Sequence, residues 1–546
     1  MAMVLFAFAF IGCRETEQQQ DYPKLPSLHI TMTSKELDSI LADRDNKVAA
    51  FALIIDSNGD TLYEGNLIYI KTRGNTSFKE PKKPFAIKFP QKQYLFGLER
   101  SKTYILLANA CDESYIRNAI GLDLARAFGI PASRYAYFSL YINDSYKGLY
   151  QLTNKVDVGG YLRITNLEKL NELANSKPCE EFEWFGYGRK KQVIQRKGVL
   201  LDRNPDDITG GYLLDNTGPI PAYTREISGF ASNANDNIRI RSPKYASPQE
   251  VEYIAKRYNE MESAVLAADG INHETGLHYT HYIDVKSFAR YYLLNELLLN
   301  WDGGWSSFMM YKDTDTKDSK IYAGPAWDFD RTLYNPNFQG NEIIMFNELY
   351  VNKKKGQPGV SHSGGLLYHL CKHEDFRQEV RNCYLNEISS VCHNYLSENT
   401  IDSLVTLLFH EADKDNSIYN IRKSKDYKTA TSIATDFLRE RIDFFDWYYS
   451  STEEERVLVT YKMSNGEIRR FYYPIEKTID APQSKMLYNK APVYELYYAG
   501  TDSIVPKGTV FHSAQVLELR KREPTKREVQ IRRIRKKLTK IGVIKN

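Results

Sequence analysis

The sequence predicts an α+β protein with two lobes and a cleft between them. Two observations support this prediction. Short runs of strand-like residues dominate the first part of the chain, whereas runs with helical periodicity dominate residues 247–449. This order is typical of α+β enzymes. At 546 residues the chain is long enough for two to four domains.

The first predicted lobe spans about residues 28–160 and is rich in strands. Strands are expected at residues 27–32, 49–56, 67–72 and 84–89, and the pair Asn58-Gly59 is typical of a hairpin turn. A helix is expected over residues 114–128, with Gly129 as its C-cap. Two more strands, at residues 135–142 and 148–152, complete this lobe.

Residues 161–207 are polar, mixed in charge and weakly periodic, so we expect an insertion there and assign no secondary structure to it. The second lobe is expected at about residues 208–450. It contains a helix over residues 248–267, a helix capped by Asp284 that continues to Leu298, and further helices between residues 366 and 449. Short strand-like runs return at residues 451–519 and predict a small, appended β module.

The net charge of +4 arises mainly from the last residues of the chain. Residues 520–546 hold a basic tail, rich in Lys and Arg, with only Glu523 and Glu528 as acids. No recognition motif accompanies this charge, so we expect no sequence-specific binding to nucleic acid. Ile531, Ile534 and Leu538 have helical spacing, which leaves open a helix that contacts an anionic surface or a solvated terminal helix.

The chain begins with an apolar run that is too short to span a bilayer and ends at Cys13, directly after Gly12. Residues 1–13 therefore resemble a bacterial lipoprotein signal peptide. Cleavage before Cys13 and acylation of that residue would anchor the protein in a membrane of the cell envelope, outside the cytoplasm, with residues 14–27 as a linker.

Six cysteines occur, and none has the CxxC spacing or the pattern of a structural zinc site. They are too few for a disulfide framework in a chain of this length. A disulfide between Cys371 and either Cys383 or Cys392 stays open for an oxidising compartment.

Three aspartates at the ends of predicted elements are candidates for chemistry. Asp302 follows a long helix, and Asp328 and Asp330 follow a strand-like run. Carboxylates on two loops that meet in space can hold a hard divalent cation and orient a hydroxyl for phosphoryl transfer. The spacing alone is equally consistent with a turn at Asp302 and a helix cap at residues 328–330.

Two basic positions in the first lobe are candidates for binding an anion. Lys88 shares one strand face with Ala86, opposite Phe85, Ile87 and Phe89, and is either a phosphate-binding lysine or a solvated one. Arg73 opens the sequence RGNTS, which is either a plain turn or a loop that offers a guanidinium and backbone N–H groups to an anion.

These pieces occur in the order found in the CotH kinase family, which the chain resembles over roughly residues 30–450. The resemblance rests on an ordered set of segments: RGNTS at 73–77, KKPFAIKF at 82–89, LLANACDESYIRN at 106–118, LYINDSYKGLY at 140–150, GGYLL at 210–214, NELLLNWD at 295–302 and YAGPAWDFD at 322–330.

The resemblance implies an atypical protein-kinase-like fold that uses ATP and Mg²⁺ or another divalent cation to phosphorylate a protein hydroxyl. It implies that Asp302 is the catalytic aspartate and that Asp328, with help from Asp330, holds the metal. Lys88 resembles the lysine that binds the nucleotide phosphates.

Four other positions match the family and are interpreted as lining the cleft or bridging the lobes. Arg73 and Asn75 are expected to contact the nucleotide. Asp112 and Arg117 are expected to bridge the lobes, or else to act as a helix-start carboxylate and its structural partner. The protein substrate is not indicated by the sequence.

The chain departs from the family pattern at two positions. Asn154 and Asp215 stand where the family usually has Glu. An amide neither neutralises a lysine nor supplies a charged metal ligand, so a catalytically inactive pseudokinase that serves as a surface binding or assembly protein is the alternative function. A carbohydrate-active enzyme with paired carboxylates is a third hypothesis, which the resemblance disfavours.

Overall fold

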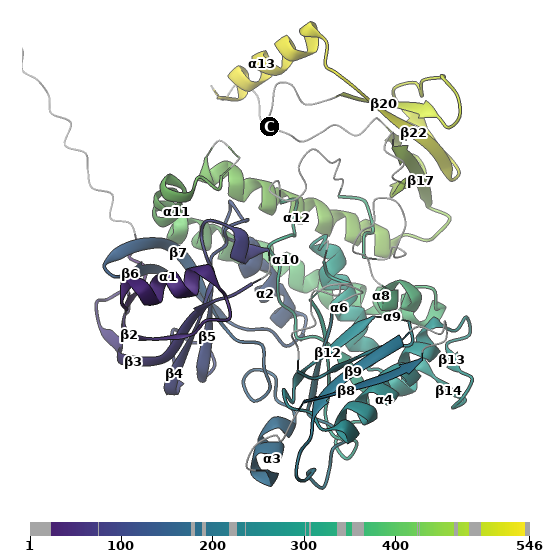
Figure 1. The fold of residues 1–546 in the computed structure, drawn as a ribbon. Helices are drawn as coiled ribbons and strands as arrows, with labels where there is room; N and C mark the ends of the chain where they lie inside the picture. The colour runs from purple at the N-terminus through teal and green to yellow at the C-terminus, as the bar shows by residue number, and fades with distance from the viewer. Residues whose placement is uncertain are drawn as a thin grey trace, which may run out of the picture.

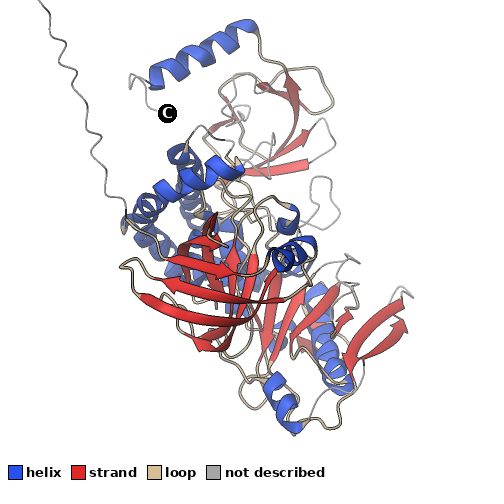
Figure 2. Ribbon diagram, turned by 60° about the vertical axis from the view of Figure 1, so that its left-hand side comes forward, coloured by secondary structure: helices blue, strands red, loops and turns tan. Residues whose placement is uncertain are grey.

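The computed structural model describes residues 23–540, except for residues 75, 176–180, 188–192, 218–226, 235, 301, 305–306, 336–345, 352–364, 423, 425, 464–467 and 480–492. Helices and several separate sheets make up the described chain, which confirms the predicted α+β content (Figures 1 and 2).

The first part of the chain forms a closed β-barrel in the strand order β1-β2-β3-β4-β5-β7-β6. The bounds of its strands are β1 (Ser27–Thr31), β2 (Val48–Ile55), β3 (Thr61–Thr72), β4 (Phe85–Gln93), β5 (Ser101–Leu107), β6 (Tyr135–Ile142) and β7 (Ser145–Asn154). Neighbouring strands pair antiparallel except β1 and β6, whose parallel pairing closes the ring. The expected strands are present, but barrel closure was not predicted.

Alternation along the barrel strands separates an inner face from an outer one. Phe85, Ile87 and Phe89 of β4 are buried in the barrel core, together with Tyr104 of β5. Lys88 lies on the outer face, as predicted. Helix α1 (Ser34–Ala42) begins with a capping box between Thr33 and Glu36, which satisfies backbone donors at its start.

A second sheet, here called the central sheet, lies beside the barrel (Figure 1). Its strand order is β16-β15-β10-β12-β11-β9-β8. The bounds are β8 (Glu181–Tyr187), β9 (Val193–Val199), β10 (Tyr212–Asn216), β11 (Gly229–Ala231), β12 (Asn237–Ser242), β15 (Phe308–Lys312) and β16 (Ile321–Ala323).

Residues 161–207, to which the sequence pattern assigned no structure, contain regular elements. This segment supplies α3 (Leu167–Ala174) and the hairpin of β8 and β9, which extends the central sheet through pairing of β9 with β11. Strand β9, with the sequence VIQRKGV, has no sustained alternation of apolar and polar residues, so the pattern did not indicate this hairpin.

Helices dominate the chain from residue 248 to 450, as predicted. They are α4 (Pro248–Leu266), α5 (Tyr279–Tyr282), α6 (Val285–Leu297), α8 (Gly365–Leu370), α9 (Glu374–Cys383), α10 (Ser389–Ser397), α11 (Thr400–Tyr419) and α12 (Tyr427–Ser450), with the short hairpin of β13 (Ile271–Asn272) and β14 (Leu277–His278). Together with α2 (Arg117–Ala127) and the central sheet, they bury the largest apolar core.

A small β module follows α12. Strands β17 (Arg456–Met463), β18 (Ile468–Pro474), β20 (Val493–Tyr498) and β22 (Gln515–Arg522) form one sheet, and β19 (Thr478–Ile479) pairs with β21 (Thr509–Val510). The module has its own apolar core. A buried ion pair between Glu348 and Arg469 joins it to the preceding part of the chain.

The last described element is α13 (Lys526–Lys540), which projects from the β module (Figure 1). In the described part of the chain, no helix is both long enough and apolar enough to cross a lipid bilayer. Cys371, Cys383 and Cys392 are buried free thiols in this structure.

Candidate active site

The loop after α6 presents Asp302. Asp284 caps the start of this helix, accepting a hydrogen bond from the Ser287 amide at 2.7 Å. After its end, the Asn300 side chain accepts a hydrogen bond from the Asp302 amide at 3.1 Å and donates one to Asn295 at 2.8 Å. A Cβ at Gly303 would lie 2.3 Å from the side-chain Oδ1 of Asn295 and 2.8 Å from its Cβ, so this turn favours glycine.

The loop after β16 presents Asp328 and Asp330. Asp328 has a φ of 69°, which is uncommon for a residue other than glycine, and its Oδ2 accepts a hydrogen bond from the Ser307 hydroxyl at 2.9 Å. The buried Phe329 between them donates its amide to Asn118 Oδ1 of α2 at 2.8 Å. The two aspartates therefore lie on either side of an anchor to α2.

Asp112 and Arg117 fix the segment that follows. Asp112 accepts hydrogen bonds from both the backbone and the side chain of Arg117, at 3.0 and 2.5 Å. The buried Arg117 guanidinium also donates to the carbonyls of Thr332, Leu333 and Tyr334. The pair thus starts α2 and also ties α2 to the loop after Asp330.

The charges of the three aspartates act on one another. Burial raises the pKa of Asp302 to about 6; Arg331, whose Nη1 lies 3.4 Å from Asp302 Oδ1, opposes this rise. Burial also raises the pKa of Asp330 well above its usual range, and the charges of Asp328 and Asp302 raise it further. The loops therefore bring the predicted carboxylates into one region.

The type of donor in this region suits a hard cation. The described residues contain no group of three or more His, Cys, Asp or Glu placed to hold a metal ion. Mg²⁺ in nucleotide sites needs only one or two carboxylates, because phosphates and water complete its coordination. Asp328 and Asp330 meet this smaller requirement, and a cation there would relieve the repulsion that raises the pKa of Asp330.

Arg73 reaches this region from the end of β3. Its guanidinium carbon lies 5.9 Å from the centre of the Trp327 ring. Burial lowers the pKa of Arg73 to about 10, whereas the charge of Asp328 favours the protonated form. Arg73 therefore stays a cation at neutral pH. Asn75, the other nucleotide-binding residue predicted in this loop, lies outside the described residues, as does Cys13.

Lys88 lies on the outer face of the barrel but does not contact the aspartates. It pairs across the sheet with Tyr69 and Thr103, and its Nζ lies 6.0 Å from the centre of the Tyr69 ring. Burial raises the pKa of Tyr69, which also feels the charge of Lys244 from the end of β12. Lys244, which follows β12, therefore lies near the outer face of the barrel at Tyr69.

The two departures from the family pattern have different surroundings. Asn154 pairs with Tyr104 and donates to the Glu99 carbonyl at 2.8 Å, so its side chain lies on the inner side of the sheet, opposite to Lys88. Asp215 is buried on β10, where it forms ion pairs with Arg239 and Arg241 of β12. Neither residue contacts Lys88 or the three aspartates.

Sequence reasoning missed Trp327, Ser307, Asn118 and Arg241 as residues of this region. The sequence held a signal for two of them. Trp327 directly precedes Asp328, and Arg241 alternates with Arg239 on a strand. The contact between Ser307 and Asp328 joins two loops and had no such signal.

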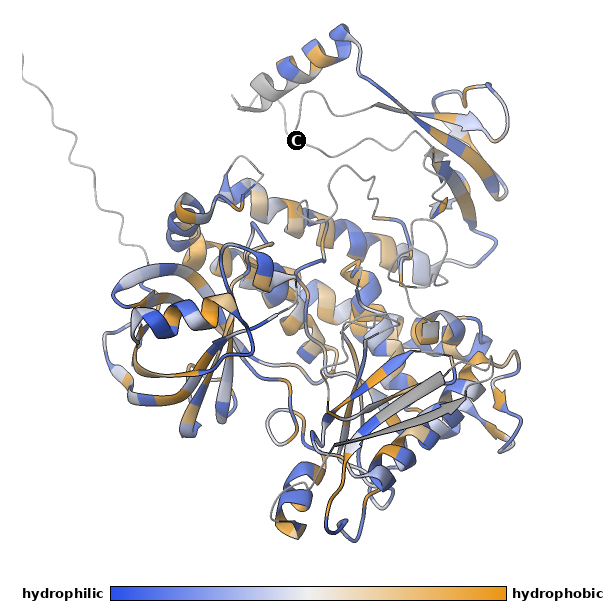
Figure 3. Ribbon diagram, in the orientation of Figure 1, coloured by the Kyte–Doolittle hydropathy of each residue, from blue (hydrophilic) through white to orange (hydrophobic). Residues whose placement is uncertain are grey.

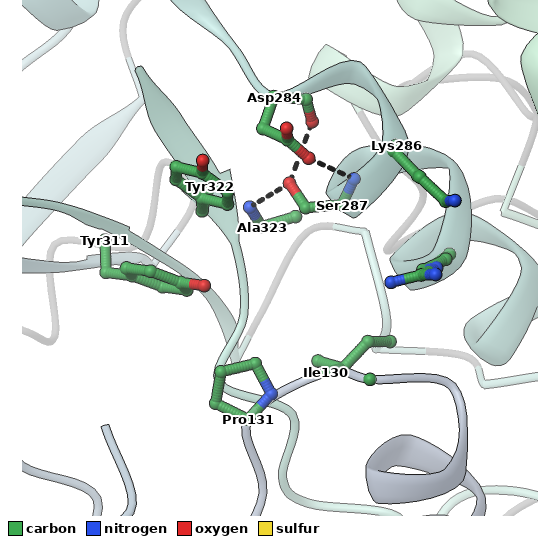
Figure 4. Close-up of a pocket in the computed structure, with 10 residues that line it drawn as sticks. Ile130, Pro131, Asp284, Lys286, Ser287, Tyr311, Tyr322 and Ala323 are labelled. Atoms are coloured by element: carbon green, nitrogen blue, oxygen red, sulfur yellow. Dashed lines mark hydrogen bonds between the residues drawn. The ribbon is translucent and has the colours of Figure 1, made fainter. Parts of the chain in front are cut away.

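A pocket of about 280 Å³ lies elsewhere, between the start of α6, the chain after α2 and strands β15 and β16. Tyr311 and Tyr322 stack on one side, and Lys286 lies across from them (Figure 4). Glu387 forms ion pairs with both Lys286 and Arg290 of the lining. None of the predicted site residues lines this pocket.

The described chain therefore has an α+β fold. It brings Asp302, Asp328 and Asp330 together with Arg73, which comes from the end of β3. The model of the CotH kinase protein family matches residues 70–445, which is well over half of the chain. The chain belongs to this family. Its several sheets and its helices fit the fold of the family. No curated protein matches the sequence.

Proposed function

We propose that this protein transfers the γ-phosphate of ATP to a hydroxyl group of a protein, with the help of a divalent cation. The observation that carries the proposal is the arrangement of Asp302 beside Asp328 and Asp330, on two loops that α6 and α2 hold in place. Phosphoryl transfer depends mainly on positioning and on charge stabilisation, which such a site supplies.

Asp302 is the residue that accepts the proton of the attacking hydroxyl. Its raised pKa of about 6 leaves it ionised at neutral pH and makes it a stronger base than a solvated aspartate. Arg331, 3.4 Å away, keeps the carboxylate oriented. Arg73 supplies a positive charge beside Asp328 that suits phosphate oxygens.

Asp328 and Asp330 would hold the divalent cation, which when bound neutralises charge on the phosphates. The Ser307 hydroxyl keeps one oxygen of Asp328 in a fixed direction. Lys88 would reach the nucleotide phosphates from the outer face of the barrel. In this proposal the barrel and the helix-rich part act as the two lobes of a kinase-like enzyme.

An inactive, CotH-like binding or assembly protein is the second candidate function. The observation that favours it is that Lys88 has no ion pair within the described chain, whereas active protein kinases pair the corresponding lysine with a glutamate. The presence of Asn154 in place of Glu does not explain why Lys88 lacks an ion pair among the described residues, because Asn154 lies on the inner face of the barrel and Lys88 on the outer face.

We also propose that the chain is exported and anchored by lipid at Cys13, on the sequence pattern of residues 1–13. A phosphotransferase in that location acts on proteins of the cell envelope. Fatty-acid labelling tests the anchor: the native protein should carry the label and Cys13→Ser should not, and a native protein without label would contradict it.

The function is tested by calorimetry of ATP binding with Mg²⁺, Mn²⁺ or Ca²⁺ and by phosphotransfer from labelled ATP, using residues 16–546. Asp302→Asn should lower kcat by about a hundredfold or more while nucleotide binding persists. Asp328→Asn should weaken metal-dependent binding, and the exposed Asp436→Asn should change neither. Absence of nucleotide binding with all three metals would overturn the proposal and favour the binding protein.

A further inference from the structure

One asparagine of α2 holds the peptide unit that directly follows Asp328. Asn118 Oδ1 accepts a hydrogen bond from the Phe329 amide at 2.8 Å, and Asn118 Nδ2 donates one to Asn109 Oδ1 at 3.2 Å. Because a backbone amide only donates, the Asn118 side chain must turn its oxygen to Phe329 and its nitrogen to Asn109. Both asparagines are 6% exposed. The two bonds therefore form a buried chain from the residues after β5, through α2, to the loop of Asp328.

Asp328 adopts a backbone conformation that needs such support. Its φ of 69° lies in the left-handed region, which is unfavourable for most residues with a Cβ and persists where surrounding contacts hold it. The bond from the Phe329 amide to Asn118 restricts rotation of the peptide unit on one side of Asp328. The Ser307 hydroxyl donates to Asp328 Oδ2 at 2.9 Å. Asn118 thus acts on the backbone at Asp328, and Ser307 acts on its carboxylate.

The other end of the loop is held by the same part of the chain. Asn335 Nδ2 donates hydrogen bonds to the Asp330 carbonyl at 2.5 Å and to the Cys111 carbonyl at 2.8 Å. Cys111 lies, like Asn109, in the turn between β5 and α2. Residues 109–118 therefore contact the loop directly at Phe329 and, through Asn335, at Asp330.

The surroundings of Asn109 argue against a purely structural contact. Among the described residues, its buried Nδ2 has no hydrogen-bond partner. A buried polar group without a partner lowers stability, so apolar side chains would serve a contact that only joins α2 to the loop better. An asparagine at position 118 is needed, by contrast, if the direction of the Phe329 amide matters.

We propose that Asn118 is a positioning residue for the cation site: it holds the backbone at Asp328 so that the carboxylate keeps the orientation that binds the cation. Asn109 keeps the Asn118 amide in the required orientation. The proposal rests on the proposed phosphotransferase function and adds to it a residue that sets the affinity for the cation. Asn118 acts only through the loop.

The readout is the concentration of free Mg²⁺ at which binding of ATP to the full chain is half-maximal in calorimetry, here called the Mg²⁺ requirement. Asn118→Leu has a similar branched shape but cannot accept the Phe329 amide. It should raise the Mg²⁺ requirement about tenfold, the effect of leaving one buried donor without a partner. Excess Mg²⁺ should restore ATP binding, because the residues that contact the nucleotide are unchanged.

Asn175→Leu is the matched control. Asn175 is also buried, and its Oδ1 accepts a backbone amide, that of Arg203, at 2.7 Å. Its side chain also donates to the carbonyls of Asn171 and Arg203, at the end of α3. Asn175→Leu should lower Tm about as much as Asn118→Leu and leave the Mg²⁺ requirement unchanged.

A double variant separates positioning from a general loss of stability. Because Asn118 and Ser307 both act on Asp328, the effects of Asn118→Leu and Ser307→Ala on the Mg²⁺ requirement should not multiply. Should Asn118→Leu fail to fold, Asn109→Gly tests the same chain. Glycine tolerates the φ of 48° at this position, and the variant should raise the Mg²⁺ requirement about threefold.

Two results would overturn the positioning role and leave the proposed function intact. One is an unchanged Mg²⁺ requirement in Asn118→Leu, or in Asn109→Gly where that variant replaces it. The other is a pair of effects that multiply in the double variant. If the native protein binds ATP at no Mg²⁺ concentration, the proposed function itself fails, and the positioning role fails with it.

Discussion

Lys82 and Asp415 form a fully buried ion pair, with Lys82 Nζ 2.9 Å from Asp415 Oδ2. Lys82 precedes strand β4 of the barrel, and Asp415 lies on α11. Asp415 also accepts hydrogen bonds from the Leu149 amide at 2.9 Å and the Tyr115 hydroxyl at 2.6 Å. A Cβ at Gly148 would lie 1.9 Å from Asp415 Oδ1, so the barrel approaches α11 closely at this point. The pair fixes the barrel to the helices.

Asp415→Asn should destabilise the protein by about 3–5 kcal/mol, because it leaves the buried Lys82 ammonium without its counter-charge. The measurement is the midpoint of urea unfolding, followed by circular dichroism. The double variant Lys82→Met with Asp415→Asn should recover part of the loss, since no charge is then buried.

Asp436→Asn is the control for this prediction. Asp436 forms an exposed pair with Arg439 on α12, and exposed pairs contribute about 0–1 kcal/mol. A similar shift for Asp415→Asn and Asp436→Asn would contradict the assigned role of the buried pair.

Gly121→Ala should disturb the candidate site by displacing Phe329, which lies between Asp328 and Asp330 in the sequence. A Cβ at Gly121 of α2 would lie 2.2 Å from the Phe329 ring and 2.7 Å from its Cβ, and Phe329 is buried between Asp328 and Asp330. We expect a loss of about 1–3 kcal/mol in stability and weaker metal-dependent binding of ATP.

Gly160→Ala is the matched control, because the nearest atom to its new Cβ, in Asp157, lies at an ordinary 4.0 Å. Thermal unfolding and calorimetry measure the two effects. Unchanged nucleotide binding in Gly121→Ala would show that the loop of Asp328 does not depend on this contact.

Ionisation of Glu250 should lower the free energy of unfolding of the protein as the pH rises. Burial raises its pKa from 4.5 to about 7, although the Ser247 amide and the Asn171 side chain donate hydrogen bonds to it. Between these pH values the folded protein binds more protons than the unfolded chain, so unfolding becomes easier as the pH increases. The contribution is about 1–3 kcal/mol.

Glu250→Gln stays neutral at every pH and should flatten the decline of Tm between pH 5 and pH 8. The control is Glu252→Gln, which changes an exposed glutamate of the same helix. If native protein and Glu250→Gln show parallel Tm curves, the raised pKa of Glu250 does not govern this pH range.

Helix α13 should bind anionic lipid. Its exposed surface combines Ile531 and Ile534, each about half exposed, with Arg533, and Figure 3 shows apolar and hydrophilic residues alternating along it. Arg522 of β22 binds Glu528 at the start of the helix through two hydrogen bonds of 2.9 and 2.8 Å and so fixes its direction. Cationic amphipathic helices of this kind lie on anionic bilayers.

Sedimentation with vesicles of phosphatidylglycerol should capture the full chain at low salt, and vesicles of phosphatidylcholine should not. Arg533→Glu should weaken binding about tenfold or more, at about 1 kcal/mol for each charge. Lys256→Glu, on the exposed side of α4, is the control. Equal losses in both variants would show general adsorption rather than binding through α13.

Much of the local structure could be predicted from the sequence. The alternation at residues 85–89 places Lys88 on the outer face, and the Asp284 cap and the apolar spacing after it define α6, because these patterns depend only on near neighbours in the chain. The positions of Asp302 and Asp328 at the ends of elements followed from the same patterns.

Other features depended on contacts between distant residues. Parallel pairing of β1 with β6 closes the barrel across more than a hundred residues, and strand β9 of the edge hairpin has no sustained alternation. The sequence did not show that Asn154 faces the barrel interior or that Asp215 binds Arg241, since both facts depend on which strands become neighbours.

The sequence by itself determined the α+β class, the helices and most strands, and the chemical types present at the candidate site. The tertiary structure decided which charges meet: Arg73 with Arg241 at Trp327, Asp302 with Arg331, and Lys82 with Asp415. The physical reason is the distance over which each kind of interaction acts. Backbone patterns act over a few residues, whereas burial and charge act through space between segments that only the folded chain brings together.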